Sequence, residues 1–342
     1  MRGGGPASLD VLSDVLEGVR LNAALFFCVE ASSPWVAEAP PGAAIAPLIL
    51  PEAQHVVSYH VLLDGSCYCE FAEGPPVKLE AGDIVIIPHG DRYALSSRPG
   101  MLGSYPEAEL CEWFRQAVAR AVPDPFNFSE GGGGAETRRV LCGFLGCDMA
   151  PFNPVLAQLP RLLHIRALAG DADARFRHLT DLALLEVRER RPGRESVLLR
   201  VSELLFVEAI RQHLAALPAG AESWLAGLRD PLVGRALILL HERPAQPWTV
   251  EELAQRSGAS RSVLAERFSQ LVGKPPMQYL MEWRMQLAAR RLCDARTKVA
   301  AVALEVGYDS EAAFSRAFKA IVGVPPATWR LERARHAAAP AR

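Results

Sequence analysis

The sequence predicts an α+β protein of more than one domain, in which a many-stranded β domain precedes an all-helical domain. Three observations support this class. Short runs of β-forming residues, separated by glycine and proline, fill the first half of the 342-residue chain. Helical periodicity replaces them from about residue 173. One helix-turn-helix pattern then occurs twice near the carboxyl end, with a connector helix expected between the copies.

The first domain is expected to open with an amphipathic helix over residues 9–22, because apolar residues recur there at helical spacing behind Ser8. Short strands are expected at residues 21–29, 45–50, 55–63, 66–71, 83–87 and 140–147. Many short strands with closely spaced turn signals predict a sandwich or a barrel. Residues 123–136 include four consecutive glycines and are expected to form a surface loop rather than a phosphate cradle, since no Lys-Ser/Thr pair follows them.

Two helices with wide apolar stripes are expected next, at residues 173–190 and 196–217. Such stripes are buried against the β domain, against each other, or against a second subunit in a homodimer, and the sequence leaves these alternatives open. The expected boundaries are 1–170 for the β domain, 171–217 for the amphipathic helices, 218–232 for a linker, 233–333 for the helical domain and 334–342 for a disordered tail.

The two copies of the helix-turn-helix pattern are in register at an offset of 50 positions. The first reads Leu253-Ala254 … Gly258-Ala259-Ser260-Arg261 … Leu264 … Phe268 … Gly273-Lys274-Pro275-Pro276. The second reads Val302-Ala303 … Gly307-Tyr308-Asp309-Ser310 … Phe314 … Phe318 … Gly323-Val324-Pro325-Pro326. Two such units, joined by one helix of fixed length, can present two recognition helices to one face of a DNA duplex.

Local signals place the ends of these helices. Thr249 and Ser260 are expected to cap the two helices of the first copy, and Gly258 to supply the positive φ of its turn. Gly307 and Ser310 repeat these roles in the second copy. The apolar residues of the two second helices are expected to face inward: Val263, Leu264, Phe268, Leu271 and Val272 in the first copy, and Phe314, Phe318 and Ile321 in the second.

The outward positions near the start of these two helices are the candidate DNA-binding residues. They are Ser260, Arg261, Ser262, Ala265, Glu266, Ser310, Glu311, Ala312, Ser315 and Arg316. Because an arginine at such a position can bond guanine O6 and N7 together, Arg316 is the strongest candidate. Arg261 is the next, with a phosphate contact as its alternative. On the connector helix expected at 277–293, Arg284, Arg290 and Arg291 either approach DNA or solvate its outer face.

The charge distribution agrees with a DNA partner. The chain as a whole has a formal net charge of −2. Residues 234–335 nevertheless carry 16 Lys and Arg against 10 Asp and Glu, while the rest of the chain carries 21 against 29. Positive charge therefore coincides with the repeat, as binding to phosphate requires. The surplus is modest, so affinity is expected to depend on geometry as well as on charge.

The second copy carries a long match to a known signature: Gly307-Tyr308-Asp309-Ser310 … Phe314-Ser315-Arg316-Ala317-Phe318-Lys319 … Gly323-Val324-Pro325-Pro326 … Trp329-Arg330. Residues 235–333 thus resemble the DNA-binding domain of the AraC/XylS family of bacterial transcription regulators. The resemblance implies base-reading positions at Ser262, Ala265, Glu266, Glu311, Ala312 and Arg316. It also implies double-stranded DNA beside a promoter and RNA polymerase as partners, and most often activation of transcription.

The segment from Gly82 to Tyr93 matches the second cupin motif, except that Tyr93 occupies the position of a histidine. Residues 9–150 thus resemble the cupin-type effector domain that many AraC/XylS regulators carry. A catalytic cupin holds Fe or Mn through two or three histidines and a carboxylate. Here the histidines are scattered, so we expect a barrel without metal, cofactor or catalytic residues. Its candidate effector-binding residues are His55, His60, His89 and Tyr93; a metal-dependent cupin enzyme with an appended helical domain is the alternative.

Cys67 and Cys69 are two positions apart on an expected strand and so share one of its faces. They are either an oxidant-sensing pair or two small apolar side chains in the core, and the effector is accordingly expected to be a small molecule or an oxidant. Seven cysteines without a C-x-x-C spacing predict neither a disulfide scaffold nor a zinc site. With no secretory signal and no apolar run near the roughly 18 residues of a membrane span, a cytoplasmic protein without membrane contact is expected.

Overall fold

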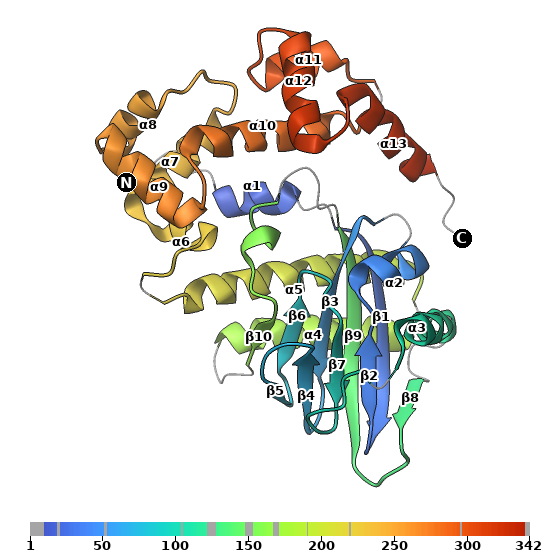
Figure 1. The fold of residues 1–342 in the computed structure, drawn as a ribbon. Helices are drawn as coiled ribbons and strands as arrows, with labels where there is room; N and C mark the ends of the chain where they lie inside the picture. The colour runs from blue at the N-terminus through green and yellow to red at the C-terminus, as the bar shows by residue number, and fades with distance from the viewer. Residues whose placement is uncertain are drawn as a thin grey trace, which may run out of the picture. The chain divides into compact units, whose positions relative to one another are not determined.

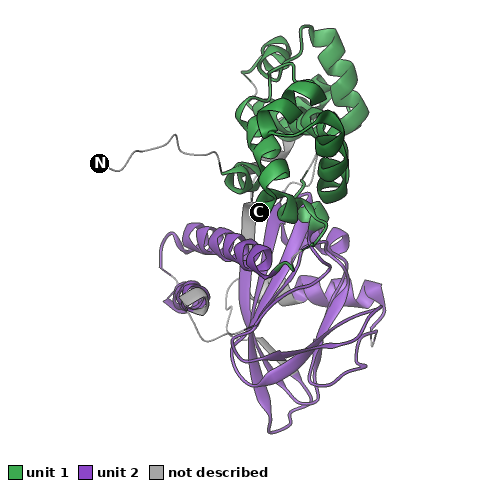
Figure 2. Cartoon of the chain, turned by 90° about the vertical axis from the view of Figure 1, so that its left-hand side faces the viewer, with its two compact units in different colours: residues 1–20, 149–158, 217–342 green, residues 21–148, 159–216 purple. Residues whose placement is uncertain are grey.

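The computed structural model describes residues 10–18, 21–50, 53–103, 105–121, 128–147, 153–166, 171–189, 191–218, 220–294 and 296–338. They divide into two compact units (Figure 2). The β unit comprises Leu21–Asp148 and Leu159–Ala216, and the helical unit combines Met1–Arg20 and Met149–Gln158 with Leu217–Arg342. The division differs from the predicted boundaries, because residues 10–18 and 153–158 are grouped with the helical unit.

The β unit contains two sheets (Figure 1). The larger has the strand order β10-β6-β3-β9-β1-β8. Its strands are β1 (Leu21–Ser32), β3 (His55–Leu62), β6 (Ile84–Ile87), β8 (Phe128–Gly131), β9 (Thr137–Cys147) and β10 (Leu163–Ile165). The smaller has the order β2-β7-β4-β5, with β2 (Val36–Ala39), β4 (Ser66–Phe71), β5 (Val77–Glu80) and β7 (Tyr93–Ser96). This confirms the predicted many-stranded β domain.

Helices cover the outer side of the larger sheet. Helix α5 (Arg194–Ala216) packs against β1, β9 and β10, and α4 (Asp171–Glu189) packs against α5. The Tyr59 hydroxyl of β3 lies 3.2 Å from the Ser202 hydroxyl of α5, which ties this helix to the centre of the sheet. Both predicted helices are therefore confirmed: α5 is buried against the β domain, and α4 and α5 also pack against each other, as the first two alternatives predicted.

Several elements of the β unit differ from the prediction. Residues 45–50, predicted as a strand, belong mainly to helix α2 (Gly42–Ile49), because a short apolar run does not distinguish a strand from a buried helix. Gly42 donates its N–H to the carbonyl of Gly90 at 2.7 Å and so holds the start of α2 against that loop. The predicted loop at 123–136 contains strand β8, and helix α3 (Glu107–Ala121) was missed. Residues 122–127 lie outside the described residues.

The helical unit contains both predicted helix-turn-helix units. The first is α8 (Val250–Ser257) with α9 (Arg261–Val272), and the second is α11 (Val299–Glu305) with α12 (Glu311–Val322). The predicted connector is α10 (Pro276–Arg291). The remaining elements are α1 (Val11–Gly18), the 3₁₀ turn η1 (Leu156–Gln158), α6 (Trp224–Arg229), α7 (Pro231–Glu242) and α13 (Pro326–Ala338). The predicted fold class is confirmed, including a helical domain in which a connector helix joins two helix-turn-helix units.

Two predicted irregular segments are helical instead. The linker predicted at 218–232 contains α6 and the start of α7. Its Trp224 is only 1% exposed, and the indole N–H donates to the hydroxyl of Tyr279 at 3.1 Å. The tail predicted to be disordered at 334–342 instead continues α13 as far as Ala338, and residues 339–342 lie outside the described part. The glycine and proline residues of 218–232 suggested an irregular linker, but the buried Trp224 within this segment packs as part of helix α6.

The amino-terminal helix α1 packs against α7 and α10 (Figure 1). Val11 and Val15 are buried in this contact. The His241 Nδ1–H donates to Asp14 Oδ2 at 2.6 Å, and Tyr279 donates its hydroxyl proton to His241 Nε2 at 2.8 Å. The helix itself was predicted, but it ends sooner than expected because β1 begins at Leu21. Among the described helices, none combines the length and apolarity needed to cross a bilayer.

Candidate nucleic-acid interface and ligand cavity

The first helix-turn-helix unit is built by the predicted local signals. The Thr249 hydroxyl accepts the N–H of Glu252 at 3.1 Å and so caps α8. Gly258 ends that helix with a φ of 88°, a conformation that favours glycine. The Ser260 hydroxyl accepts the N–H of Val263 at 3.4 Å and caps α9. Both predicted caps and the predicted turn glycine are confirmed.

The second unit repeats this construction. Gly307 forms its turn with a φ of 84°, and the Ser310 hydroxyl accepts the N–H of Ala313 at 3.2 Å to cap α12. Both recognition helices also end alike, at Gly273 and Gly323 in the left-handed conformation. Since caps and turns match, α9 and α12 present equivalent first turns.

Most of the ten candidate DNA-binding side chains are exposed. The exposed ones are Ser260, Arg261, Ser262, Glu266, Ser310, Glu311, Ala312 and Arg316, and the half-buried ones are Ala265 and Ser315. The inward prediction is confirmed for Phe268 and Phe318, which are fully buried. It is wrong for Val263, which is 53% exposed. Leu264 and Phe268 already define the buried face at a spacing of four, so Val263 falls beside it. Sequence reasoning therefore missed an apolar side chain on the exposed face.

The arginines of this region differ in their partners. Arg316 has no ion-pair partner among the residues that the structure describes. Arg261 Nη1 lies 2.8 Å from Glu251 Oε1 of α8. The half-buried Arg284 donates to the carbonyl oxygens of Pro244 at 2.6 Å and Gln246 at 2.8 Å.

These bonds give Arg284 a structural role, which contradicts the alternative that it simply solvates the outer face of the connector. Burial lowers the pKa of its guanidinium. The other two connector arginines remain nearer the surface. Arg290 Nη2 lies 3.6 Å from Glu17 Oε2, and Arg291 Nε lies 3.6 Å from Glu305 Oε2. Both are loose pairs, which contribute little to stability.

A close backbone contact joins the two helix-turn-helix units. A Cβ atom on Gly307 would lie 2.5 Å from the carbonyl oxygen of Ala245, in the loop between α7 and α8. Arg284 of the connector helix holds the residues on either side of Ala245. The turn of the second unit is therefore seated on a loop that leads into the first.

In the β unit, the structure brings together two of the four candidate effector-binding residues. His60 Nε2 lies 2.5 Å from the hydroxyl oxygen of Tyr93, and both residues are buried. Burial lowers the pKa of His60 to about 3, so its ring is neutral. His55 and His89 make other bonds, since their Nε2 atoms lie 2.6 Å from the Pro88 carbonyl and 2.8 Å from the Leu159 carbonyl. No group of three or more His, Cys, Asp or Glu in the described ranges has the arrangement of a metal site.

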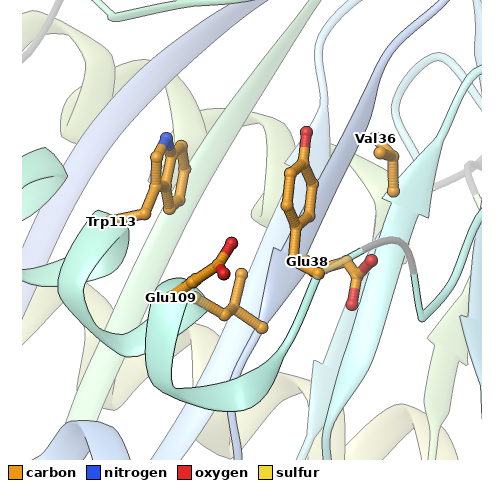
Figure 3. A pocket seen from close by; sticks show the side chains of 6 residues that line it. Val36, Glu38, Glu109 and Trp113 are labelled. Atoms are coloured by element: carbon orange, nitrogen blue, oxygen red, sulfur yellow. The ribbon is translucent and has the colours of Figure 1, made fainter.

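Two cavities lie in this part of the β unit, and the inner one adjoins the His60–Tyr93 pair. The inner one, of about 40 Å³, is lined by both residues and by apolar side chains that include Phe114 and Phe144. The outer one, of about 200 Å³, lies between β2 and α3 (Figure 3). Glu38 and Trp113 line both cavities. Sequence reasoning missed the outer cavity, because it depends on a helix and a short strand that were not predicted.

Cys67 and Cys69 lie in the core of the β unit, at 1% and 0% exposure. Burial raises the pKa of each thiol to about 12. A thiol rather than a thiolate is therefore present at neutral pH, and thiols react slowly with oxidants. The geometry favours the second alternative, two small side chains packed in the core.

Comparison with known proteins gives consistent matches to both units. Residues 10–215 match a family model described as cupin, and residues 253–332 match one described as a helix-turn-helix domain. The chain is 31% identical to an AraC-like transcription regulator of Streptomyces lividans, over 94% of this chain and 98% of that protein. It is 29% identical to the HTH-type transcriptional regulator AlkR of Acinetobacter baylyi, over 91% and 95%.

A solved structure resembles the helical unit. The DNA-binding domain of AdpA, a global transcriptional factor crystallised with a target DNA, is 33% identical to this chain. The alignment covers 32% of this chain and 98% of that domain, with a TM-score of 0.30.

Proposed function

Since this chain belongs to the AraC family of transcription regulators, we propose that it binds its operator through α9 and α12 and activates transcription when a ligand occupies its β unit. DNA binding and transcription regulation follow from the family. The contacting residues, the ligand control and the direction of regulation are the proposal. The observation that carries it is the equivalent construction of the two recognition helices, whose capped first turns are exposed.

Each recognition helix would enter one segment of the major groove, with the two segments about one turn, or ~34 Å, apart. In α12, Arg316 would bond guanine and Glu311 would accept from cytosine N4. In α9, Glu266 would read a base edge and Val263 would contact a thymine methyl group. The capping serines and Arg261 would lie near phosphates, because helix N-termini favour anions.

The decisive experiment compares two cations on the same helix. Duplexes bound by the full-length chain are selected from genomic DNA, and Kd is then measured by fluorescence anisotropy on a selected duplex and on a scrambled one. Arg316→Ala should weaken binding to the selected duplex by about 1–3 kcal/mol, the contribution of a bidentate base contact. Its effect on the scrambled duplex should be smaller.

Lys319→Ala is the matched control, because Lys319 is an exposed cation one turn further along α12. It should weaken binding to both duplexes equally, as a nonspecific charge does. If Arg316→Ala has no larger effect on the selected duplex than Lys319→Ala, then Arg316 does not read a base. If the full-length chain selects no duplex at all, the proposed operator binding is wrong.

We also propose a second copy of the chain as a partner. Three leucines on the helices that cover the larger sheet face solvent: Leu182 at 38%, Leu185 at 43% and Leu204 at 53% exposure. Pairing two such faces would remove apolar area from water and place two DNA-binding units on one operator. Sedimentation of the Leu185→Glu/Leu204→Glu variant should give a lighter species than the wild type at the same concentration. An unchanged sedimentation coefficient would argue against this surface.

The remaining assignments follow from the same proposal. An activator of this kind would contact RNA polymerase beside its promoter and would work in the cytoplasm. The β unit would serve as a ligand-binding domain with no catalytic role, since Tyr93 already engages the Nε2 atom of His60. The inner cavity next to that pair, together with the outer cavity that shares Glu38 and Trp113 with it, is the proposed effector site.

A further inference from the structure

The outer cavity of the β unit is lined by an unusual combination of side chains. Val36 and Glu38 of β2, Tyr105, and Glu109, Leu110 and Trp113 of α3 form its wall. Figure 3 shows Glu109 and Trp113 projecting from α3 on the side that faces Glu38 and Val36. Their spacing of four places these two side chains on one face of the helix. Trp113 is 37% exposed and Tyr105 is 48% exposed, so two partly exposed aromatic side chains line the rim.

The cavity carries an excess of negative charge. Arg92 Nη2 donates to Glu38 Oε2 at 2.6 Å, and the side chain of Glu38 is fully buried. The same guanidinium donates to the carbonyl of Tyr105 at 2.9 Å, which holds the aromatic residue at the rim. Arg92 therefore balances the charge of Glu38. Glu109 is exposed and has no ion-pair partner in the part of the chain that the structure describes, so its charge is not balanced.

The inner end of the site also lacks a partner. Glu38 and Trp113 line both cavities, so the outer cavity lies next to the inner one. The inner wall is apolar apart from Glu38 and the pair of His60 and Tyr93. His60 Nδ1 is buried and has no hydrogen-bond partner within the described residues. A buried polar atom without a hydrogen-bond partner destabilises a fold. A polar atom at the tip of a bound molecule would remove that penalty.

We propose that the two cavities bind a small organic cation, an amine on an apolar body about the size of one aromatic ring. This inference rests on the function proposed above, in which the β unit binds the effector. Aromatic faces attract ammonium groups, and the unbalanced carboxylate of Glu109 adds a direct attraction. The volume of about 200 Å³ suits such a body, since an apolar cavity of roughly 150 Å³ binds benzene. An anion of the same size would be repelled by Glu109.

Three probes of matched size and different charge test the ligand class. Phenethylamine is a cation at neutral pH, 2-phenylethanol is neutral and 3-phenylpropionate is an anion. Each is titrated into the purified full-length chain by isothermal titration calorimetry at pH 7. Phenethylamine should bind at least about tenfold more tightly than 2-phenylethanol, equivalent to ~1.4 kcal/mol, and 3-phenylpropionate should bind most weakly. Equal binding of all three, tighter binding of the anion, or no binding of phenethylamine would overturn the proposal.

Variants then locate the site. Glu109→Gln removes the unbalanced charge from an exposed position and should weaken phenethylamine binding about tenfold. Trp113→Leu should weaken it similarly, and Trp113→Phe should restore most of the affinity, because the aromatic face is retained. Glu112→Gln is the matched control: Glu112 lies on the same helix, pairs with Arg115 at 2.6 Å and does not line either cavity. If Glu109→Gln and Glu112→Gln have the same effect, the site lies elsewhere.

The same samples separate this inference from the proposed function. The Glu109→Gln and Trp113→Leu variants should keep wild-type affinity for the selected duplex in the absence of phenethylamine, because both residues belong to the β unit. DNA binding without phenethylamine binding in the wild type would overturn the cation site and leave the regulator intact. Failure of the wild type to select any duplex would instead remove the proposed operator binding, whatever the calorimetry shows.

Discussion

The two helix-turn-helix units have the same caps and the same turn glycines, yet their turns have different surroundings. Around Gly258 of the first unit, no described atom lies within 4 Å of the position that a Cβ would occupy. Around Gly307 of the second unit, the carbonyl oxygen of Ala245 lies 2.5 Å from that position. The first glycine serves only the conformation of its turn. The second serves its turn and also allows a backbone contact with another part of the helical unit.

The difference shows how the spacing of the two recognition helices is fixed. A connector helix alone sets a length, but it leaves each unit free to rotate about its end. In this protein the second turn also rests on the loop at 244–246, and Arg284 of the connector binds two carbonyls of that loop. Three elements therefore meet at one place. The geometry that two adjacent grooves require depends on this contact as well as on the helix.

The largest expected effect comes from adding one methyl group at each turn. Gly258→Ala forces a left-handed conformation on alanine and should lower the free energy of unfolding by about 1–2 kcal/mol. Gly307→Ala adds a steric conflict with Ala245 and should lower it by about 2–5 kcal/mol. Urea unfolding followed by circular dichroism at 222 nm measures both. Equal losses would mean that the loop moves aside, and the contact would then not fix the spacing.

A smaller effect is expected from the arginine that holds the loop. Arg284→Gln removes a charged donor from two carbonyls and should lower the free energy of unfolding by about 1.5–3 kcal/mol. It should also weaken operator binding, although Arg284 is not proposed to touch DNA. Arg291→Gln is the control, because Arg291 is 69% exposed in a loose pair and should change stability by about 0–1 kcal/mol. Urea unfolding and anisotropy titrations of the two variants provide the comparison.

If Arg284→Gln weakens binding to selected and scrambled duplexes by the same small factor as Arg291→Gln, then Arg284 contributes only charge. The spacing of the recognition helices would then depend on the backbone contact between Gly307 and Ala245 without a contribution from Arg284. A loss confined to the selected duplex would instead link the loop to the spacing of the recognition helices, because a scrambled duplex does not require both helices to engage specific bases.

A third effect depends on pH and belongs to the contact between α1 and α7 in the helical unit. His241 of α7 is buried against α1, and desolvation lowers its pKa although the hydrogen bond that it donates to Asp14 acts in the opposite direction. The folded state therefore keeps His241 neutral, while the unfolded state gains a proton below about pH 6.5. The contribution of neutral His241 to the free energy of unfolding is fully present above that pH. It decreases as the pH falls below that value, by at most about 1.4 kcal/mol per pH unit.

His241→Gln removes this titration and keeps one donor for Asp14 and one acceptor for Tyr279. The free energy of unfolding at pH 7, 6 and 5 should thus fall less steeply in the variant than in the wild type. Other histidines with lowered pKa values contribute equally to both proteins, so the difference isolates His241. Identical slopes would show that the loss of stability at low pH does not depend on the contact between α1 and α7 at His241.

The parts of this fold that follow local rules could be predicted from the sequence. Caps, turn glycines and the buried faces of α9 and α12 depend on neighbours within a few residues, and Ser260, Gly258 and Phe268 behave as their types suggest. Contacts between distant segments could not be predicted. Nothing near Gly307 in the sequence indicates Ala245, and nothing near Asp14 indicates His241. The prediction of a strand in place of the short helix α2 was wrong for a related reason, since burial rather than periodicity decides the conformation of this segment.

The same limit applies to the sites. Exposure of the candidate recognition residues could be predicted because it follows from helical spacing, except at Val263, where an apolar type suggested burial. The ion pair of Arg261 could not be predicted, since its partner Glu251 lies on the preceding helix and comes close to Arg261 only in the folded structure. The ligand cavity was beyond reach, because it joins residues of β2 and α3. Sequence motifs thus predicted the candidate DNA-binding surface, whereas the candidate effector cavity became apparent only from the folded structure.

The smallest expected effect separates the two recognition helices at their arginines. Arg316 is unpaired within the described residues, whereas Arg261 is held by Glu251 at 2.8 Å. Glu251→Gln should release Arg261 for one further phosphate contact. Operator affinity should rise by about 0.2–1 kcal/mol, the typical contribution of an exposed ion pair, and the slope of log Kd against log salt should steepen by about 0.9.

Glu252→Gln is the matched control, because it removes the same charge one residue away but releases Arg256, its partner at 2.8 Å, instead of Arg261. Anisotropy titrations at several salt concentrations should then show the steeper slope only in Glu251→Gln. The same change in both variants would mean that long-range charge, and not the release of Arg261, controls affinity. A steeper slope in Glu251→Gln alone would show a difference between two recognition helices of the same construction. Arg261 must first leave the carboxylate of Glu251 before it can bind DNA, whereas Arg316 has no such ion pair to break within the described residues.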